Sequence, residues 1–148
     1  MKRSTIIDII NGLLILLFSY AILSKLINHE MFQAQLIKFP VLDTSPALFS
    51  WLIPVSELFV ILILFIPKFK LYGLYAALSL LILFTVFLIL MISFDKNLPC
   101  SCGGIISKLS WKQHIAFNLF FIVLSVIGIK FQREMNQQQA MHLKSLLQ

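Results

Sequence analysis

Residues 71–94 read LYGLYAALSLLILFTVFLILMISF, a stretch with no charged side chain and almost no polar one. About 20 consecutive apolar residues are enough for a helix to cross the hydrocarbon core of a bilayer, which is about 30 Å thick. Inside lipid, every backbone N–H and C=O must be paired within the protein, so such a stretch forms a helix rather than a lone strand. We therefore predict a transmembrane helix over residues 71–94.

The whole chain shares this apolar character. Of its 148 residues, 59% are hydrophobic and only 12% are charged, whereas a soluble domain is about half apolar and a quarter charged. A chain this short has too little interior to hide so much apolar surface from water. The composition excludes a soluble globular domain, a disordered chain and a nucleic-acid-binding protein with a polar body. It leaves a small all-α integral membrane protein.

Other apolar runs complete a predicted four-helix transmembrane bundle. The first run follows two basic residues, as in a signal peptide, but no convincing small-residue cleavage site follows it, so we expect an uncleaved helix. The bundle occupies residues 1–130, and a polar C-terminal tail occupies residues 131–148 and either prolongs the fourth helix into water or lies on the membrane. Besides residues 71–94, we predict spanning helices over residues 6–23, 47–66 and 111–129.

The polar segments between the runs indicate how the bundle is oriented. Polar and apolar residues mix over His29 to Phe39, which predicts a short interfacial helix between the first two spans. Seven basic residues lie on the side of the termini and five on the other side, and basic residues are enriched in cytoplasmic segments. We therefore expect a multi-pass protein of the bacterial cytoplasmic (inner) membrane with cytoplasmic termini and an extracytoplasmic cysteine loop.

The two cysteines of the chain, Cys100 and Cys102, lie in the loop before the last predicted helix. A disulfide between them would close a small, strained ring, and strain makes a disulfide easier to reduce. Lysines in the same region favour the reactive thiolate. The pair therefore predicts a redox centre. Two alternatives are loop cysteines without a function and a soft-metal site for Cu(I) or Zn(II), completed by His114 or His29.

Glu57 lies about midway along the second apolar run. A carboxylate is costly in lipid, so we expect it to face the bundle interior. Pro54, three residues earlier in the same helix, can kink that helix. The functional interpretation is a proton relay or a ligand-binding acid, for example for a quinone head group. The structural alternative is an interhelical hydrogen bond that holds the bundle together. Lys25 ends the first span at the same level. Its default is to extend to the headgroups, and pairing with Glu57 is the alternative.

Trp111, His114 and Asn118 are spaced so that they share one face at the start of the fourth span. His114 is a candidate base for a cysteine or a proton donor to a quinone, and Asn118 is a candidate hydrogen-bond donor to Glu57 or to a ligand. The structural alternatives are an interfacial anchor for Trp111 and a hydrogen-bonded interfacial histidine for His114.

Together these features resemble the MauE/DoxX family of small, four-helix, redox-associated membrane proteins. The resemblance covers Ile6 to Ile129. Family members often have Gly after the Ser-type residue where this chain has Lys25, and Cys-x-Cys-Phe-Gly where this chain has Cys102-Gly103-Gly104. The residues that carry the resemblance are Ser24-Lys25-Leu26, Pro54-x-x-Glu57, and Cys100-x-Cys102-Gly103-Gly104 before Trp111, His114 and Asn118.

The resemblance implies a role in forming or keeping protein disulfides outside the cytoplasm. MauE is associated with the maturation of a disulfide-rich enzyme subunit, and DoxX-like relatives with quinone-coupled oxidoreductases. Our leading hypothesis is thiol–disulfide exchange with an extracytoplasmic thioredoxin-like or other cysteine-containing protein. The alternatives are a non-catalytic anchor or assembly subunit and a soft-metal-handling protein. The candidate catalytic residues are Cys100, Cys102 and His114, and the residues that would hold a quinone cofactor are Glu57, Asn118, Trp111 and Lys25.

Overall fold

Helices make up nearly all of the described part of the chain. The structure is a computed structural model, and it describes residues 3–37, 45–94 and 111–147. In chain order, the elements are α1 (Arg3–Ile27), α2 (His29–Ile37), α3 (Pro46–Phe65), the short 3-10 helix η1 (Pro67–Phe69), α4 (Lys70–Phe94) and α5 (Trp111–Leu146).

Within these ranges, four helices are long and apolar enough to cross a membrane: α1, α3, α4 and α5. This confirms the predicted transmembrane bundle, and α2 forms where a short helix was expected between the first two spans. The outer faces of the spans carry exposed apolar side chains such as Leu16, Phe59 and Tyr72. A soluble protein rarely exposes so continuous an apolar surface, whereas a bilayer requires it.

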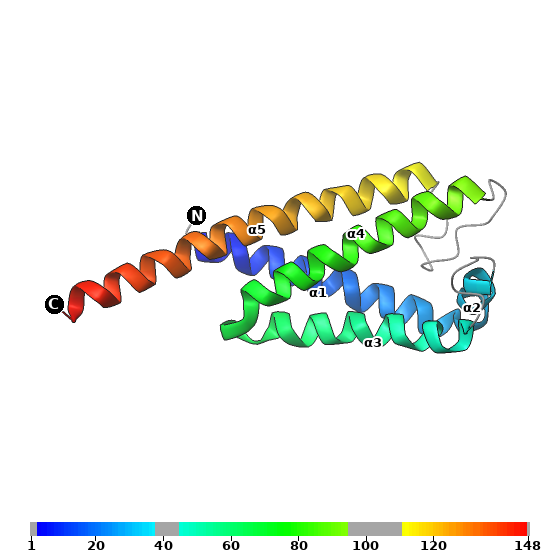
Figure 1. Ribbon diagram of the computed structural model, residues 1–148, viewed down its shortest axis with the longest axis horizontal. Coiled ribbons are helices and arrows are strands. Elements are labelled where there is room, and N and C mark those ends of the chain that lie inside the picture. The colour runs from blue at the N-terminus through cyan, green and yellow to red at the C-terminus, as the bar shows by residue number, and fades with distance from the viewer. Residues whose placement is uncertain (1–2, 38–44, 95–110, 148) are drawn as a thin grey trace.

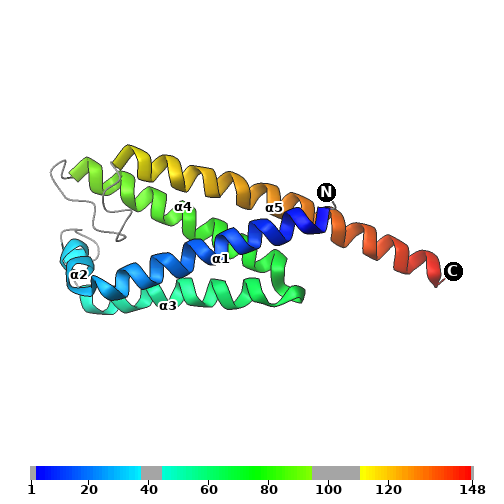
Figure 2. The same ribbon diagram turned by 180° about the vertical axis from the view of Figure 1, so that it is seen from behind.

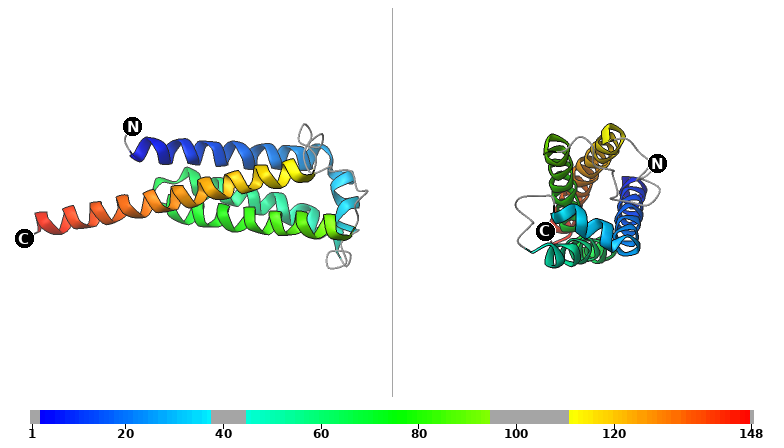
Figure 3. Two further views of the ribbon diagram at one scale, coloured as in Figure 1. Left: turned by 90° about the horizontal axis from the view of Figure 1, so that it is seen from above. Right: turned by 90° about the vertical axis from the view of Figure 1, so that its right-hand side faces the viewer.

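The spanning helices form a closed ring in which each packs against two neighbours. Helix α1 packs against α3 and α5, and α4 packs against the same two helices. Helices α3 and α4 meet at the η1 turn and separate toward the other end of the bundle, where α4 runs beside α5 (Figures 1 and 2). Helix α2 lies across that end, as both views in Figure 3 show.

Two glycines allow close helix contacts in the interior of the bundle. A Cβ atom at Gly73 would lie 2.8 Å from Leu64 Cδ2, so α4 approaches α3 closely near the η1 turn. A Cβ atom at Gly128 would lie 3.2 Å from Ile10 Cγ2, so α5 approaches α1 closely. The core around these contacts is aliphatic and aromatic, and includes Leu14, Phe18, Val60, Leu74 and Leu81.

Ion pairs join the helices at the end of the bundle that holds the N-terminus. Asp8 of α1 accepts a hydrogen bond from Lys70 of α4 at 2.7 Å, and Arg3 donates to Glu134 of α5 at 2.6 Å. Helix α5 continues to Leu146 rather than ending near Ile129, and it projects beyond the other helices (Figure 1). The segment after Gly128 contains good helix formers and neither Gly nor Pro, so nothing in it ends the helix.

Candidate functional site

A buried ion pair joins α1 to α3 near the end of the bundle that α2 covers. Lys25 Nζ donates to Glu57 Oε1 at 2.7 Å, and the two side chains are 8% and 0% exposed. Lys25 therefore does not extend to the headgroups, which was its default expectation. It turns inward because the last turn of α1 packs beside the middle of α3. A buried charge without a partner is costly, and the pair removes most of that cost.

Two aromatic rings also contact the Lys25 ammonium. Its Nζ atom lies 5.1 Å from the centroid of the Phe84 ring and 5.9 Å from that of the Phe32 ring. Both distances are in the range of cation–π attraction. Neither residue can be recognised from the sequence, since a Phe among many apolar residues has no distinguishing spacing.

The second carboxylate oxygen of Glu57 lacks a hydrogen-bond donor among the described residues. Glu57 Oε2 is buried and, among the described residues, accepts no hydrogen bond. Buried polar atoms in proteins are nearly always satisfied, so an exception calls for an explanation such as a water, an ion or a ligand. Glu57 is also one of the residues that line an adjoining cavity.

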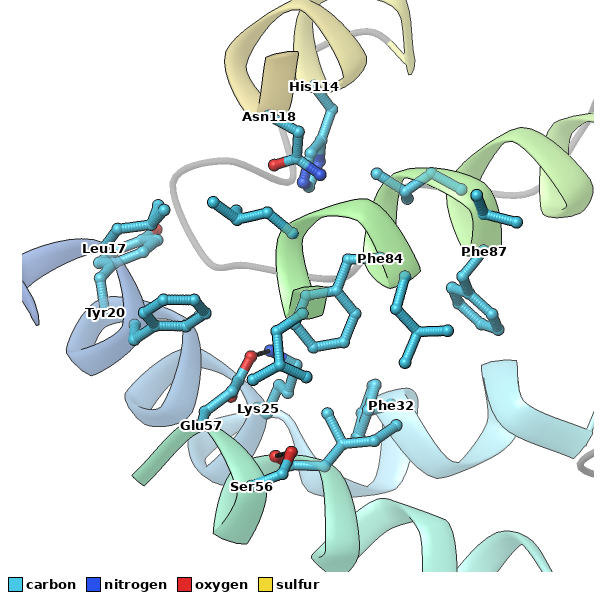
Figure 4. Close-up of a pocket in the computed structure, with 18 of the residues that line it drawn as sticks. Leu17, Tyr20, Lys25, Phe32, Ser56, Glu57, Phe84, Phe87, His114 and Asn118 are labelled. Atoms are coloured by element: carbon cyan, nitrogen blue, oxygen red, sulfur yellow. Dashed lines mark hydrogen bonds and ion pairs between the residues drawn. The ribbon is translucent and has the colours of Figure 1, made fainter. Parts of the chain in front are cut away.

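An apolar cavity of about 520 Å³ adjoins the ion pair. Figure 4 shows Lys25 and Glu57 on one side of it and His114 and Asn118 pointing toward it from α5. Asn118 is buried and His114 is partly buried. Between these polar groups the walls are mainly aliphatic and aromatic, and include Leu17, Phe18, Tyr20, Phe49, Phe84 and Phe87.

The structure thus brings together four of the predicted site residues: Lys25, Glu57, His114 and Asn118 all line the same cavity. Trp111 is the first residue of α5, but the description does not extend to its side chain. Cys100 and Cys102 lie outside the described residues. The end of α4 and the start of α5, which flank them in the chain, lie at the end of the bundle where α2 is found (Figures 1 and 2).

The histidines named for a metal site lie on different elements. His29, at the start of α2, stacks on Trp51 of α3 with ring centroids 5.0 Å apart, whereas His114 lines the cavity from α5. In the described parts of the chain, no group of three His, Cys, Asp or Glu side chains could hold a metal ion.

Comparison with known protein families gives a match over most of the chain. The family model described as methylamine utilisation protein MauE matches residues 3–131. No curated protein and no solved structure matches the chain. The match spans all four transmembrane helices up to the base of the projecting part of α5, and it confirms the MauE part of the resemblance seen in the sequence. The chain therefore belongs to the MauE family.

Proposed function

We propose that this protein is a membrane thiol–disulfide oxidoreductase in which Cys100 and Cys102 form the reactive pair and a quinone accepts their electrons. The observation that carries the proposal is an apolar cavity, with a buried and partly unpaired carboxylate, at the end of the bundle where α4 ends and α5 begins. Membership of the MauE family supports a membrane accessory role.

Chain length supports a cysteine pair at the cavity end. Cys100 follows Phe94 by six residues, and Cys102 precedes Trp111 by nine. At about 3.6 Å per residue, these segments reach at most about 22 and 32 Å. The 25 residues of α4 extend over about 37 Å. Both segments are shorter than α4, which supports the proposed place of the pair at the end with the cavity.

The electron balance of the proposed reaction is simple. A disulfide between Cys100 and Cys102 accepts two electrons and two protons from a partner dithiol, which becomes a disulfide. The two cysteine thiols then return two electrons and two protons to the acceptor and form their disulfide again. A quinone, when bound, supplies a lipid-soluble acceptor for two electrons and two protons.

The polar groups of the cavity suit a quinone ring. Lys25 and Asn118 carry N–H donors for its carbonyl oxygens, and the Glu57 carboxylate is an acceptor for the hydroxyl of the reduced form. His114 lines the same cavity and is the candidate to transfer a proton. The apolar walls between these groups fit the ring itself.

We further propose the orientation that this chemistry requires. The termini are cytoplasmic, and the cysteine loop lies outside the cytoplasmic membrane of a bacterium, where disulfides persist. The partner is then a thioredoxin-like or other cysteine-containing protein of that compartment, and the outcome is the formation or maturation of its disulfides.

The experiment that tests the proposal traps the partner on one cysteine. In cells, the Cys100 thiolate of the Cys102→Ser variant attacks the disulfide of the oxidised partner and releases one partner thiol. Cys102 is absent and cannot resolve the resulting mixed disulfide, which should accumulate and should disappear on reduction. The same test is made with Cys100→Ser, and Ser101→Ala is the matched control within the motif. If neither single variant forms a mixed disulfide and both still support oxidation of the partner, the proposal fails.

One structural feature favours a second candidate function, a non-catalytic anchor of an envelope or redox complex. The projecting part of α5 carries exposed apolar residues, Met141, Leu143 and Leu146, beyond the bundle. Under this alternative, the cysteine pair would stay oxidised in cells and would not respond to mild reductant. A pair that cycles between the two redox states favours the oxidoreductase.

A further inference from the structure

The residues that line the cavity differ in exposure from one side to the other. On α1 and α5, the lining residues are buried or partly buried, and include Phe18, Lys25 and Asn118. On α3 and α4, several lining residues are also exposed on the outer surface of the bundle. A residue that both lines a cavity and is exposed marks the mouth of that cavity. These residues are Leu52, Leu83, Val86 and Leu90.

The positions of the cavity-lining residues around α4 agree with a cavity that opens along one side of this helix. With 3.6 residues per turn, Leu83, Val86 and Leu90 lie on the same flank of α4. Leu81 and Leu88 also line the cavity, but they are buried and lie on the opposite flank. The exterior therefore meets the cavity along only one edge of this helix.

Helix α3 provides the other edge. Glu57 lies on the side of α3 that meets Lys25 of α1, and it is fully buried. Leu52 is about 140° further around the helix and is exposed. Helices α3 and α4 also separate toward this end of the bundle, as Figure 1 shows. The mouth is therefore between α3 and α4, at a level where both helices face lipid.

We propose that the cavity opens sideways into the membrane through a portal between α3 and α4, defined by Leu52, Leu83, Val86 and Leu90. The occupant enters from the bilayer, with its ring beside Glu57 and Asn118 and its hydrocarbon chain in the portal. The inference rests on the proposed quinone. The portal side chains are all aliphatic and suit a hydrocarbon chain, whereas the polar groups that would hold a ring lie deeper.

The test locates the hydrocarbon chain directly. The full-length protein in lipid nanodiscs is photolabelled with a benzoquinone that carries a diazirine on a decyl chain, with and without excess decyl benzoquinone as competitor. We expect competed label on Leu52, Leu83, Val86 or Leu90. We expect none on Ile82 and Ile89, which are exposed on α4 but do not line the cavity.

A pair of matched double variants tests access. Leu83→Phe with Val86→Phe narrows the portal and should lower the competed label by about fivefold or more. Ile82→Phe with Ile89→Phe adds the same bulk to a lipid-facing flank of the same helix and should leave the label unchanged. Equal label in both double variants, or competed label on α1 and α5 instead, overturns the portal.

The proposed function and the portal can fail separately. If no competed label forms anywhere while Cys102→Ser still traps a partner, the quinone and the portal both fall and thiol exchange stands. If competed label forms at the portal but no partner is trapped, the portal stands and the thiol reaction falls.

Discussion

The sequence predicts the position of Glu57 better than that of its partner Lys25. A carboxylate in the middle of an apolar run predicts an inward-facing group, and Glu57 is indeed fully buried. Its partner was less predictable, because a lysine at the end of a span can extend either outward or inward. The choice depends on how α1 packs against α3, which no local pattern encodes.

The ion pair leads to a prediction about stability. Lys25→Met or Glu57→Leu alone leaves one buried charge without its partner and should destabilise the protein by about 3 kcal/mol, seen as a lower melting temperature in detergent. The double variant replaces both charges by apolar groups and should recover most of this loss. It would still lack the polar groups proposed for ligand binding.

An exposed pair in the same protein provides the control. Lys70 and Asp8 also lie 2.7 Å apart, but their side chains are 25% and 60% exposed. Lys70→Met should therefore cost at most about 1 kcal/mol. If Lys25→Met and Lys70→Met lower the melting temperature equally, the buried pair has no special role in stability.

At the scale of the helices, the sequence predicted which segments span and missed where they end. The apolar runs mark the spans because lipid demands apolar side chains along the whole crossing. The helices begin and end in polar segments, where composition gives no such signal. Thus α1 runs from Arg3 to Ile27, beyond the predicted residues 6–23, and α5 continues to Leu146.

The contact between α3 and α4 gives a prediction for one glycine. A methyl group at Gly73 would meet Leu64 Cδ2 at 2.8 Å and the Leu64 backbone nitrogen at 3.1 Å. Gly73→Ala should therefore force the helices apart and destabilise the bundle by about 1–3 kcal/mol, measured by thermal unfolding in detergent.

A second glycine shows whether the effect comes from the contact or from the residue type. In the described part of the chain, a Cβ at Gly12 of α1 would meet no other side chain or helix within 4 Å. Gly12→Ala should therefore be neutral or slightly stabilising through its helix propensity. Equal destabilisation by both substitutions would show that close packing at Gly73 is not the cause.

For the whole molecule, the two ends of the bundle differ in character. One end holds the N-terminus, two ion pairs and the base of the projecting α5, and the other holds α2, the buried Lys25–Glu57 pair and the cavity. From the sequence, an even number of spans predicts only that both termini lie at one end of the bundle and the cysteine loop at the other. The sequence did group Glu57, His114 and Asn118 as residues of one site, and they share the cavity. It could not predict the size or the apolar lining of that cavity, because these depend on how far packed helices separate.

The orientation of the bundle gives a prediction for labelling from outside the cell. After mild reduction, Cys100 and Cys102 should react with a membrane-impermeant maleimide added to intact spheroplasts, because we expect their loop outside. Gln148→Cys in a background without Cys100 and Cys102 should react only after the membrane is permeabilised. The reverse pattern would show the opposite orientation.

The close contact of Gly73 with Leu64 has a mechanical consequence. It holds α3 and α4 together at one end, so a change in the angle between them displaces Leu90, about 25 Å further along α4, more than Gly73. A tilt of about 5° at Gly73 then moves Leu90 by about 2 Å. Bilayer thickness acts on the tilt of spanning helices, so the lipid itself would adjust the width of the opening at Leu90.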